Sequence, residues 1–181
     1  MGYEVEILRH PTEEDWGRCK MMAMNTIGRP WRGDVSEEWK RKILRSEHSP
    51  IRTLMFTIRM KVPYWVSVHF CRHKYGIEHY VASQRNDRQS RYDRNRAPQG
   101  TVVRHVMDVN AQELIQMARM RLCRQASAET RMVMTDIRDA VVQTNPEFAD
   151  FLVPKCVAHG GCNEFRSCGY YERSKDDGEQ G

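Results

Sequence analysis

The sequence predicts a single helix-rich α+β domain, and three observations support this class. Residues 4–8 alternate polar and apolar side chains as a half-buried strand does, and residues 51–60 are rich in β-forming side chains. Residues 110–144 place apolar side chains at steps of three and four, the spacing of a helix that packs one face against a core. The chain has 181 residues and no internal repeat, which fits one domain with a sizeable core.

The first half of the chain contains two clear helix starts. Thr12 and Ser36 each precede a pair of acidic residues, so each can cap a helix whose positive end the acids stabilise. Residues 64–72 carry enough apolar side chains for either a helix or a strand. The other elements expected here are strands over residues 4–8 and 51–60 and helices over residues 12–25 and 36–45.

The second half is dominated by the long helical pattern. Gly76 and the polar run over residues 83–100 predict loop with short helix, and residues 102–103 predict a brief strand. The helix can use Asn110 as its N-cap, and it ends near residue 144 because Pro146 follows. We therefore expect a domain over residues 1–153, a Cys/His-rich segment over 154–171 and a disordered polar tail over 172–181.

The charge pattern predicts a polyanionic ligand. The net charge is +5, and the cations between residues 72 and 104 are mostly arginine. Arginine binds phosphate and carboxylate through paired hydrogen bonds, whereas a merely solvated basic face, which is the alternative, does as well with lysine. The cations are Arg72, Lys74, Arg85, Arg88, Arg91, Arg94, Arg96 and Arg104.

Neither a membrane nor a secretory location is predicted. No apolar run approaches the roughly 18 residues of a membrane span, and the N-terminus lacks the charged and then apolar order of a signal peptide. We expect a cytoplasmic protein with no membrane partner, in which the six cysteines stay reduced.

Two ordered blocks of motifs carry the functional prediction. The first block consists of Glu47-His48-Ser49-Pro50-Ile51, Phe56-Thr57, Val62-Pro63, Phe70-Cys71-Arg72-His73-Lys74 and Ser83-Gln84-Arg85. The second consists of Arg94 four residues before Pro98, then Asn110-Ala111-Gln112-Glu113-Leu114, Met120-Arg121 and Ala126-Ser127-Ala128-Glu129. Over residues 47–131 the two blocks together resemble the flavin-dependent thymidylate synthases, in a shortened form. Ser90-Arg91-Tyr92 competes for the Ser-x-Arg position, but Ser83 fits the spacing better.

The resemblance implies a fold, a reaction and an assembly. It implies a small antiparallel sheet within a helix-rich domain, and it favours a helix over residues 64–72. The implied reaction moves a one-carbon unit from methylenetetrahydrofolate to C5 of dUMP and gives dTMP. FAD is the implied cofactor, NADPH the reductant, and a homotetramer with shared active sites the implied assembly.

The resemblance also assigns residues to ligands. The residues assigned to the flavin and folate side are His48, Arg72, His73, Lys74, Asn110 and Gln116. The residues assigned to the nucleotide are His69, Ser83, Gln84, Arg85, Arg94 and Arg121. Arg121 and Ser83 are assigned to catalysis, with Arg121 against the uracil, where a cation stabilises the negative charge that develops on the carbonyl oxygens.

The sequence departs from the family pattern at several of these positions. Lys74 replaces an arginine, which keeps the charge but loses the two-point hydrogen bonding of a guanidinium. Gln112 replaces another arginine, and Asn86 stands where the family has tyrosine. His69 stands where the family has glutamine. These departures leave open a related flavin-dependent modification of another pyrimidine nucleotide.

The Cys/His-rich segment lies outside the family pattern and predicts a metal site. Its candidate ligands are Cys156, His159, Cys162 and Cys168. Such a set can surround a zinc ion, or an iron–sulfur cluster with a ligand from elsewhere in the chain. The alternative is a loop of reduced thiols that packs on the core.

Two other functional classes compete with the flavoenzyme. A metal-containing nucleic-acid-binding module would use the arginines, but few aromatic residues accompany them, and single-strand binders usually stack bases on aromatic side chains. Nucleic acid is therefore not the expected partner. The other class is a family member that has lost catalysis and acts as a partner subunit.

Overall fold

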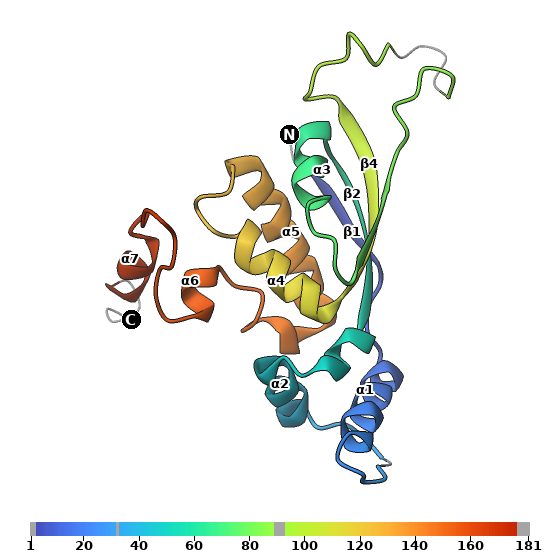
Figure 1. Cartoon of the computed structure of the whole chain (residues 1–181), viewed down its shortest axis with the longest axis vertical. Coiled ribbons are helices and arrows are strands. Elements are labelled where there is room, and N and C mark those ends of the chain that lie inside the picture. Colours follow the sequence, from blue (N-terminus) through green and yellow to red (C-terminus); the bar gives the residue numbers. More distant parts are fainter. Residues whose placement is uncertain (1–2, 32, 89–92, 177–181) are drawn as a thin grey trace.

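The structure is a computed structural model, and it describes residues 3–31, 33–88 and 93–176. It confirms the predicted class, a helix-rich α+β fold around one four-stranded antiparallel sheet with the strand order β1-β2-β4-β3. Helices α4 and α5 lie against one face of this sheet, and α1 and α2 lie beyond one of its ends (Figure 1).

The two central strands give the sheet its length. They pair without interruption from Met55 opposite Asn110 to Pro63 opposite Val102. Every second side chain of β2 from Phe56 to Val62 is buried, which is the alternation of a strand with one face on the core. The strands are β1 (Glu4–Arg9), β2 (Met55–Pro63), β3 (Ile77–Val81) and β4 (Val102–Asn110).

Most of the longer helices begin at the side-chain caps that the sequence predicts. Thr12 forms a reciprocal capping box with Asp15, and Ser36 and Asn110 each accept a backbone N–H in the first turn. The helices are α1 (Glu13–Asn25), α2 (Glu37–Ser46), α3 (Tyr64–Phe70), α4 (Ala111–Arg121), α5 (Ala128–Thr144), α6 (Lys155–Ala158) and α7 (Tyr170–Asp176). Short 3₁₀ helices are η1 (Ser49–Thr53) and η2 (Pro146–Phe148).

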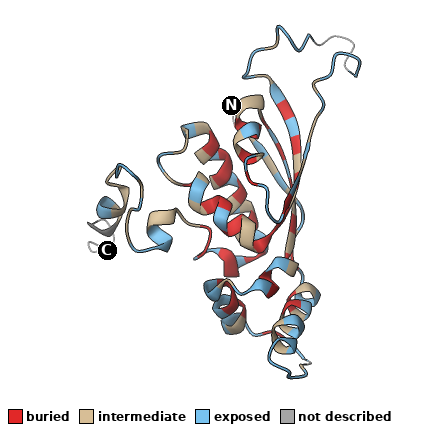
Figure 2. Cartoon of the chain, in the orientation of Figure 1, coloured by how far each residue is buried: buried red, intermediate tan, exposed pale blue. Residues whose placement is uncertain are grey.

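The buried side chains gather between the sheet and helices α4 and α5 and continue toward α1 and η2 (Figure 2). At that end Phe148 packs edge-on against Phe56, and the Trp16 indole N–H donates to the Glu147 carboxylate over 2.8 Å. Trp16 and Glu147 are both buried, so this bond satisfies two polar groups inside the core.

Three predicted elements differ from the structure. The single helix over residues 110–144 is two helices, because the chain turns after Arg121 and Ser127 caps a new start. The brief strand at residues 102–103 is the nine-residue β4, whose alternation is hidden in the sequence by the buried polar His105. The stretch after Gly76, where no strand was predicted, begins with the strand β3.

The C-terminal part also differs from the prediction. A disordered tail is expected from residue 172, but α7 covers Tyr170–Asp176, and residues 177–181 lie outside the described part. The Arg124 guanidinium lies 4.5 Å from the centre of the Tyr170 ring, which ties this helix to the turn after α4. Among the helices described, none has both the length and the apolar character needed to cross a bilayer.

Candidate active site

Helix α4 carries predicted site residues at both of its ends. β4 ends at Asn110, whose side chain accepts the Glu113 N–H over 2.9 Å, so the helix continues directly from the sheet. The helix ends at Arg121. The sheet therefore fixes the position of both residues, and the helix length sets the distance between them.

A hydrogen-bonded network joins Arg121 to the predicted Arg-His-Lys motif. His73 Nδ1 lies 2.7 Å from Glu113 Oε1, and the Arg121 Nε–H donates to His73 Nε2 over 3.1 Å. Because Nε2 accepts, the proton of the neutral ring is on Nδ1 and is donated to Glu113. Both nitrogens of His73 are thus bonded within the chain, and the ring orients Arg121.

A second contact holds the same guanidinium. Arg121 Nη2–H donates to the backbone carbonyl of His69 over 2.8 Å. The His69 ring is held in turn, with Nδ1 2.8 Å from Thr130 Oγ1. Arg121 is therefore fixed on α3 and on the loop that follows it, and among the described residues three of its five N–H groups keep no protein partner.

The electrostatics of this cluster favour an anionic ligand. Burial, and next the positive charge of Arg72, lower the pKa of Arg121 below its ordinary value. The pKa of His69 is lowered by burial and then by Arg121 and Arg72. The positive charges of Arg72 and Arg121 thus act on one another, an arrangement that negative charge would stabilise.

An open cleft lies beside this network, at the N-terminal end of α4. Glu113 lines it and also bonds His73, so the wall of the cleft is linked to the Arg121 network through hydrogen bonds. Glu47 lines the same cleft and forms a two-point ion pair with Arg119. The lining residues are Glu47, Arg52, Tyr75, Gly76, Asn110, Gln112, Glu113 and Gln116.

One glycine in the cleft permits a close approach of two chain segments. Gly76 has φ +72°, and its carbonyl accepts the Asn110 N–H over 2.9 Å. A Cβ at position 76 would meet Asn110 Nδ2 at 2.1 Å. A side chain here would therefore displace the N-cap of α4.

The predicted flavin-side residues occupy different places. Asn110 and Gln116 line the cleft, and Arg72 and Lys74 are exposed on the loop that carries His73. His48 is exposed and lines a separate hollow with residues of α1 and α2. The structure thus brings Asn110 and Gln116 together and leaves His48 outside the cleft.

The predicted phosphate-binding residues lie on the loop between β3 and β4. This loop projects beyond the end of the sheet, away from α4 and α5 (Figure 1). Arg85 pairs with Asp87 over 2.7 Å, and the exposed Arg94 donates its backbone N–H to Asn86 over 3.0 Å. Ser83 and Gln84 begin the loop, and the competing match at residues 90–91, with residue 92, lies outside the described residues.

A pair of histidines behind His73 was missed in the sequence. His79 Nε2 lies 3.0 Å from the His73 carbonyl oxygen and therefore carries the proton, so His79 Nδ1 accepts from His105 Nε2 over 2.9 Å. Burial, and next His79, lower the pKa of His105 to about 4. Because the sequence interpretation overlooked β3, nothing linked these two histidines.

The predicted metal ligands are only partly brought together. Cys156, Cys162 and Cys168 line one pocket, but His159 is exposed and does not line it. Cys123, which follows α4, is the fourth cysteine that lines this pocket. Cys123 was not among the predicted ligands, and Glu113 was given no role within its motif. Nothing in the sequence links Cys123 to a cysteine cluster that begins 33 residues further along the chain.

Comparison with known proteins supports both the fold and the second motif block. A family model described as thymidylate synthase complementing protein matches residues 93–147. Among solved structures, a crystal structure of the UMP/dUMP methylase PolB from Streptomyces cacaoi bound with 5-Br dUMP matches with a TM-score of 0.62 and 16% identity. The match covers 83% of this chain and 97% of that chain. No curated protein sequence matches the chain.

These matches bear on the predictions in two ways. The family model confirms, over residues 93–147, the resemblance to flavin-dependent thymidylate synthases that the motif blocks indicate. The solved structure confirms the fold as a helix-rich domain with a small antiparallel sheet.

Proposed function

We propose that this chain is a flavin-dependent methyltransferase that converts dUMP to dTMP, with methylenetetrahydrofolate as one-carbon donor and NADPH as reductant. The observation that carries the proposal is the guanidinium of Arg121, which His73 and the His69 carbonyl hold and which keeps three N–H groups without a partner among the described residues. Through His73 it is linked to Glu113 in the wall of the cleft. The family match over residues 93–147 supports the reaction class. The similar fold of a UMP/dUMP methylase supports a pyrimidine nucleotide as substrate.

Arg121 would bind the uracil and stabilise its developing charge. Attack at the pyrimidine ring places negative charge on a carbonyl oxygen, and a fixed cation stabilises that charge without reorganising first. His73 is a positioning residue in this scheme, because its Nε2 holds the guanidinium and its Nδ1–H is anchored on Glu113.

The cleft has the donors and acceptors that a flavin ring requires. Asn110, Gln112 and Gln116 offer side-chain amides, which can donate or accept, and the Tyr75 ring is exposed at the rim. Arg72 and Lys74, on the adjoining loop, would face the pyrophosphate of FAD. FAD would supply the hydride chemistry, and the chain would supply orientation and charge.

The projecting loop would bind the nucleotide phosphate in a neighbouring subunit. Arg85 and Arg94 are exposed on the loop between β3 and β4, which projects beyond the end of the sheet (Figure 1). In a homotetramer, the loop of one subunit could reach the Arg121 site of its neighbour. The phosphate site and the uracil site would then belong to one nucleotide. We therefore propose four shared active sites, each with Arg121 of one chain and the loop of another.

Turnover of the purified protein tests this proposal. The protein is loaded with FAD and incubated with NADPH, methylenetetrahydrofolate and either dUMP or UMP, and the nucleotides are separated chromatographically. We expect dTMP from dUMP, formed only when all components are present. A matched control is Arg138→Ala on α5, a half-buried arginine that lies outside the cleft and pairs with Asp139, and it should leave turnover unchanged.

Two outcomes would contradict the proposal. A protein that takes up no flavin and is not stabilised by dUMP against heat would lack the binding site itself. A protein that binds both ligands but methylates UMP and not dUMP would keep the reaction class and overturn the substrate.

A further inference from the structure

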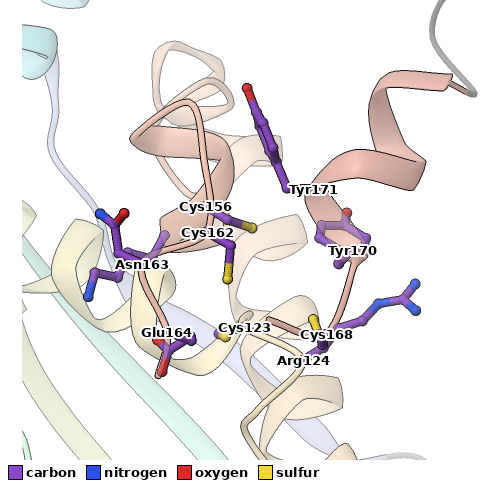
Figure 3. A pocket seen from close by; sticks show the side chains of 10 residues that line it. Cys123, Arg124, Cys156, Cys162, Asn163, Glu164, Cys168, Tyr170 and Tyr171 are labelled. Atoms are coloured by element: carbon purple, nitrogen blue, oxygen red, sulfur yellow. The ribbon is translucent and has the colours of Figure 1, made fainter. Parts of the chain in front are cut away.

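Four cysteines from two distant parts of the chain face one pocket, the four-cysteine pocket. Cys123 lies just after α4, and the others are Cys156, Cys162 and Cys168 of the C-terminal segment. Figure 3 shows the four sulfur atoms directed toward the same space, between the end of α4 and the tyrosines of α7. All four are free thiols, so no disulfide accounts for their meeting.

The C-terminal segment has no hydrophobic core that would explain its ordered path. From Val153 to Ser174 no residue is buried, and α6 is only four residues long. Its ties to the rest of the chain include the packing of α6 against α4. They also include the Gln125 side-chain amide donating to the Arg166 carbonyl over 2.8 Å and the stacking of Arg124 on Tyr170. Short segments without a core generally need a disulfide or a metal to hold one conformation.

The ligand set and its surroundings suit a thiolate-bound metal centre. A site made only of cysteines selects zinc or an iron–sulfur cluster. Four thiolates bring net negative charge, and the cations Arg124 and Lys155 line the same pocket. The exposed His159 is not needed, because Cys123 completes four ligands.

The spread of the sulfur atoms distinguishes the two metals. Zinc–sulfur bonds of about 2.3 Å in a tetrahedron hold the sulfurs within about 4 Å of one another. Among the described residues, only Cys71, His79 and His105 form a group of three whose ligand atoms all lie within 4.8 Å. The four cysteines are therefore spread more widely than a single zinc ion would hold them. An iron–sulfur cluster places iron and sulfide atoms between its thiolates.

We propose that the four-cysteine pocket holds an iron–sulfur cluster, which fastens the C-terminal segment to the end of α4. The cluster lies close to the candidate active site along the chain, since Cys123 is two residues beyond Arg121. Its role here is to hold structure. The inference rests on the cysteines alone, so it stands or fails independently of the proposed methyltransferase.

The competing group at Cys71 has a different explanation. His79 and His105 are hydrogen-bonded to one another, and His79 also donates to the His73 carbonyl. Three of their four ring nitrogens are thus hydrogen-bonded within the chain, and the fourth, His105 Nδ1, is buried without a partner among the described residues. Cys71 therefore serves as a matched control, because it is a half-buried cysteine outside the four-cysteine pocket.

The test is metal analysis of the full chain purified without oxygen. Iron and acid-labile sulfide, neither of which a flavin contributes, should be present in equal amounts. Serine substitutions of Cys123, Cys156, Cys162 or Cys168 should lower the iron content at least tenfold, whereas Cys71→Ser should retain it. Proteolysis should cut the C-terminal segment of the four variants at least tenfold faster than that of the wild type.

Several results would overturn the proposal. Zinc without iron would show that the pocket holds a single ion and not a cluster. A metal-free protein, or iron retained in all four variants, would show that the four cysteines do not form a metal site. If the variants fail to fold by circular dichroism, the wild-type protein is stripped with a chelator and reconstituted with iron and sulfide. Failure to regain iron in that experiment would also contradict the cluster.

Discussion

The α4 end of the molecule and the loop between β3 and β4 present their arginines in opposite ways. Arg121 is half-buried, and its guanidinium is held by a ring nitrogen and a carbonyl oxygen. Arg94 is exposed, and its hydrogen bond to the Asn86 side chain is donated by the backbone N–H. The first arrangement fixes a charge before any ligand arrives, and the second leaves a charge free to reach one.

This difference indicates a division of labour in the proposed site. A fixed cation is what transition-state stabilisation requires, because reorganisation would cost part of the gain. A free cation on a projecting loop suits ground-state binding of phosphate by charge-assisted hydrogen bonds. Changes around Arg121 at the end of α4 should therefore lower kcat and the free energy of unfolding. Changes in the loop between β3 and β4 should instead raise KM for the nucleotide.

The largest expected effect is that of Arg121→Ala. Removing a fixed cation at the site of developing charge should lower kcat by about 10²–10³-fold, or about 3–4 kcal/mol. Single-turnover kinetics with dUMP would measure it. If kcat is unchanged and KM alone rises, Arg121 is a binding residue and the proposed division is wrong.

The buried histidine of β4, His105, should also make stability depend on pH. His105 has a pKa of about 4 when folded, against about 6.5 when unfolded. Between these values the unfolded chain binds the extra proton, so stability falls as pH falls from about 6.5 to 4, by roughly 3 kcal/mol in all. Urea unfolding across this range should show the slope, reduced in His105→Gln and kept in His159→Gln, which changes an exposed histidine. An unchanged slope in His105→Gln would contradict the assignment.

Two glycine substitutions compare the regions directly. Gly76→Ala combines a left-handed backbone with a clash against Asn110, and it should lower the free energy of unfolding by about 2 kcal/mol. Gly100→Ala, in the projecting loop with no atom within 4 Å of its Cβ, should change it by less than about 0.5 kcal/mol. Equal effects in thermal unfolding would show that the two regions do not differ in packing.

The smallest effect is expected in the loop. Arg94→Ala should raise KM for dUMP about tenfold while kcat stays constant, since a charged hydrogen bond contributes about 1.5–3 kcal/mol and an exposed one lies at the lower end of that range. Arg96→Ala removes the same charge from the same loop and should change KM much less. A matching rise in both variants would mean that general attraction, and not a specific contact, binds the phosphate.

The sequence predicted the fold better than it predicted the site. Caps at Thr12, Ser36 and Asn110 marked three helix starts, because capping depends on neighbouring residues alone. β3 and most of β4 were missed, since His79 and His105 interrupt the apolar pattern and pair only across the sheet.

The contacts of the site join residues that are far apart in the sequence, so no short motif could predict them. His73 was assigned to the flavin, but both its nitrogens are engaged by Glu113 and Arg121, 40 and 48 residues away. Cys123 was left out of the predicted metal ligands for the same reason, although it lines the four-cysteine pocket.

Co-expression of Arg121→Ala with Arg94→Ala tests the central claim most directly, that the two regions meet in one nucleotide site across a subunit boundary. Each variant alone should be impaired, and mixed tetramers should regain up to about one quarter of the wild-type sites, because random pairing unites an intact Arg121 with an intact Arg94 that often. Recovery of dTMP formation in the mixed sample, measured at a dUMP concentration below KM, is the predicted result. A mixture no more active than the average of its two parents would contradict the shared site.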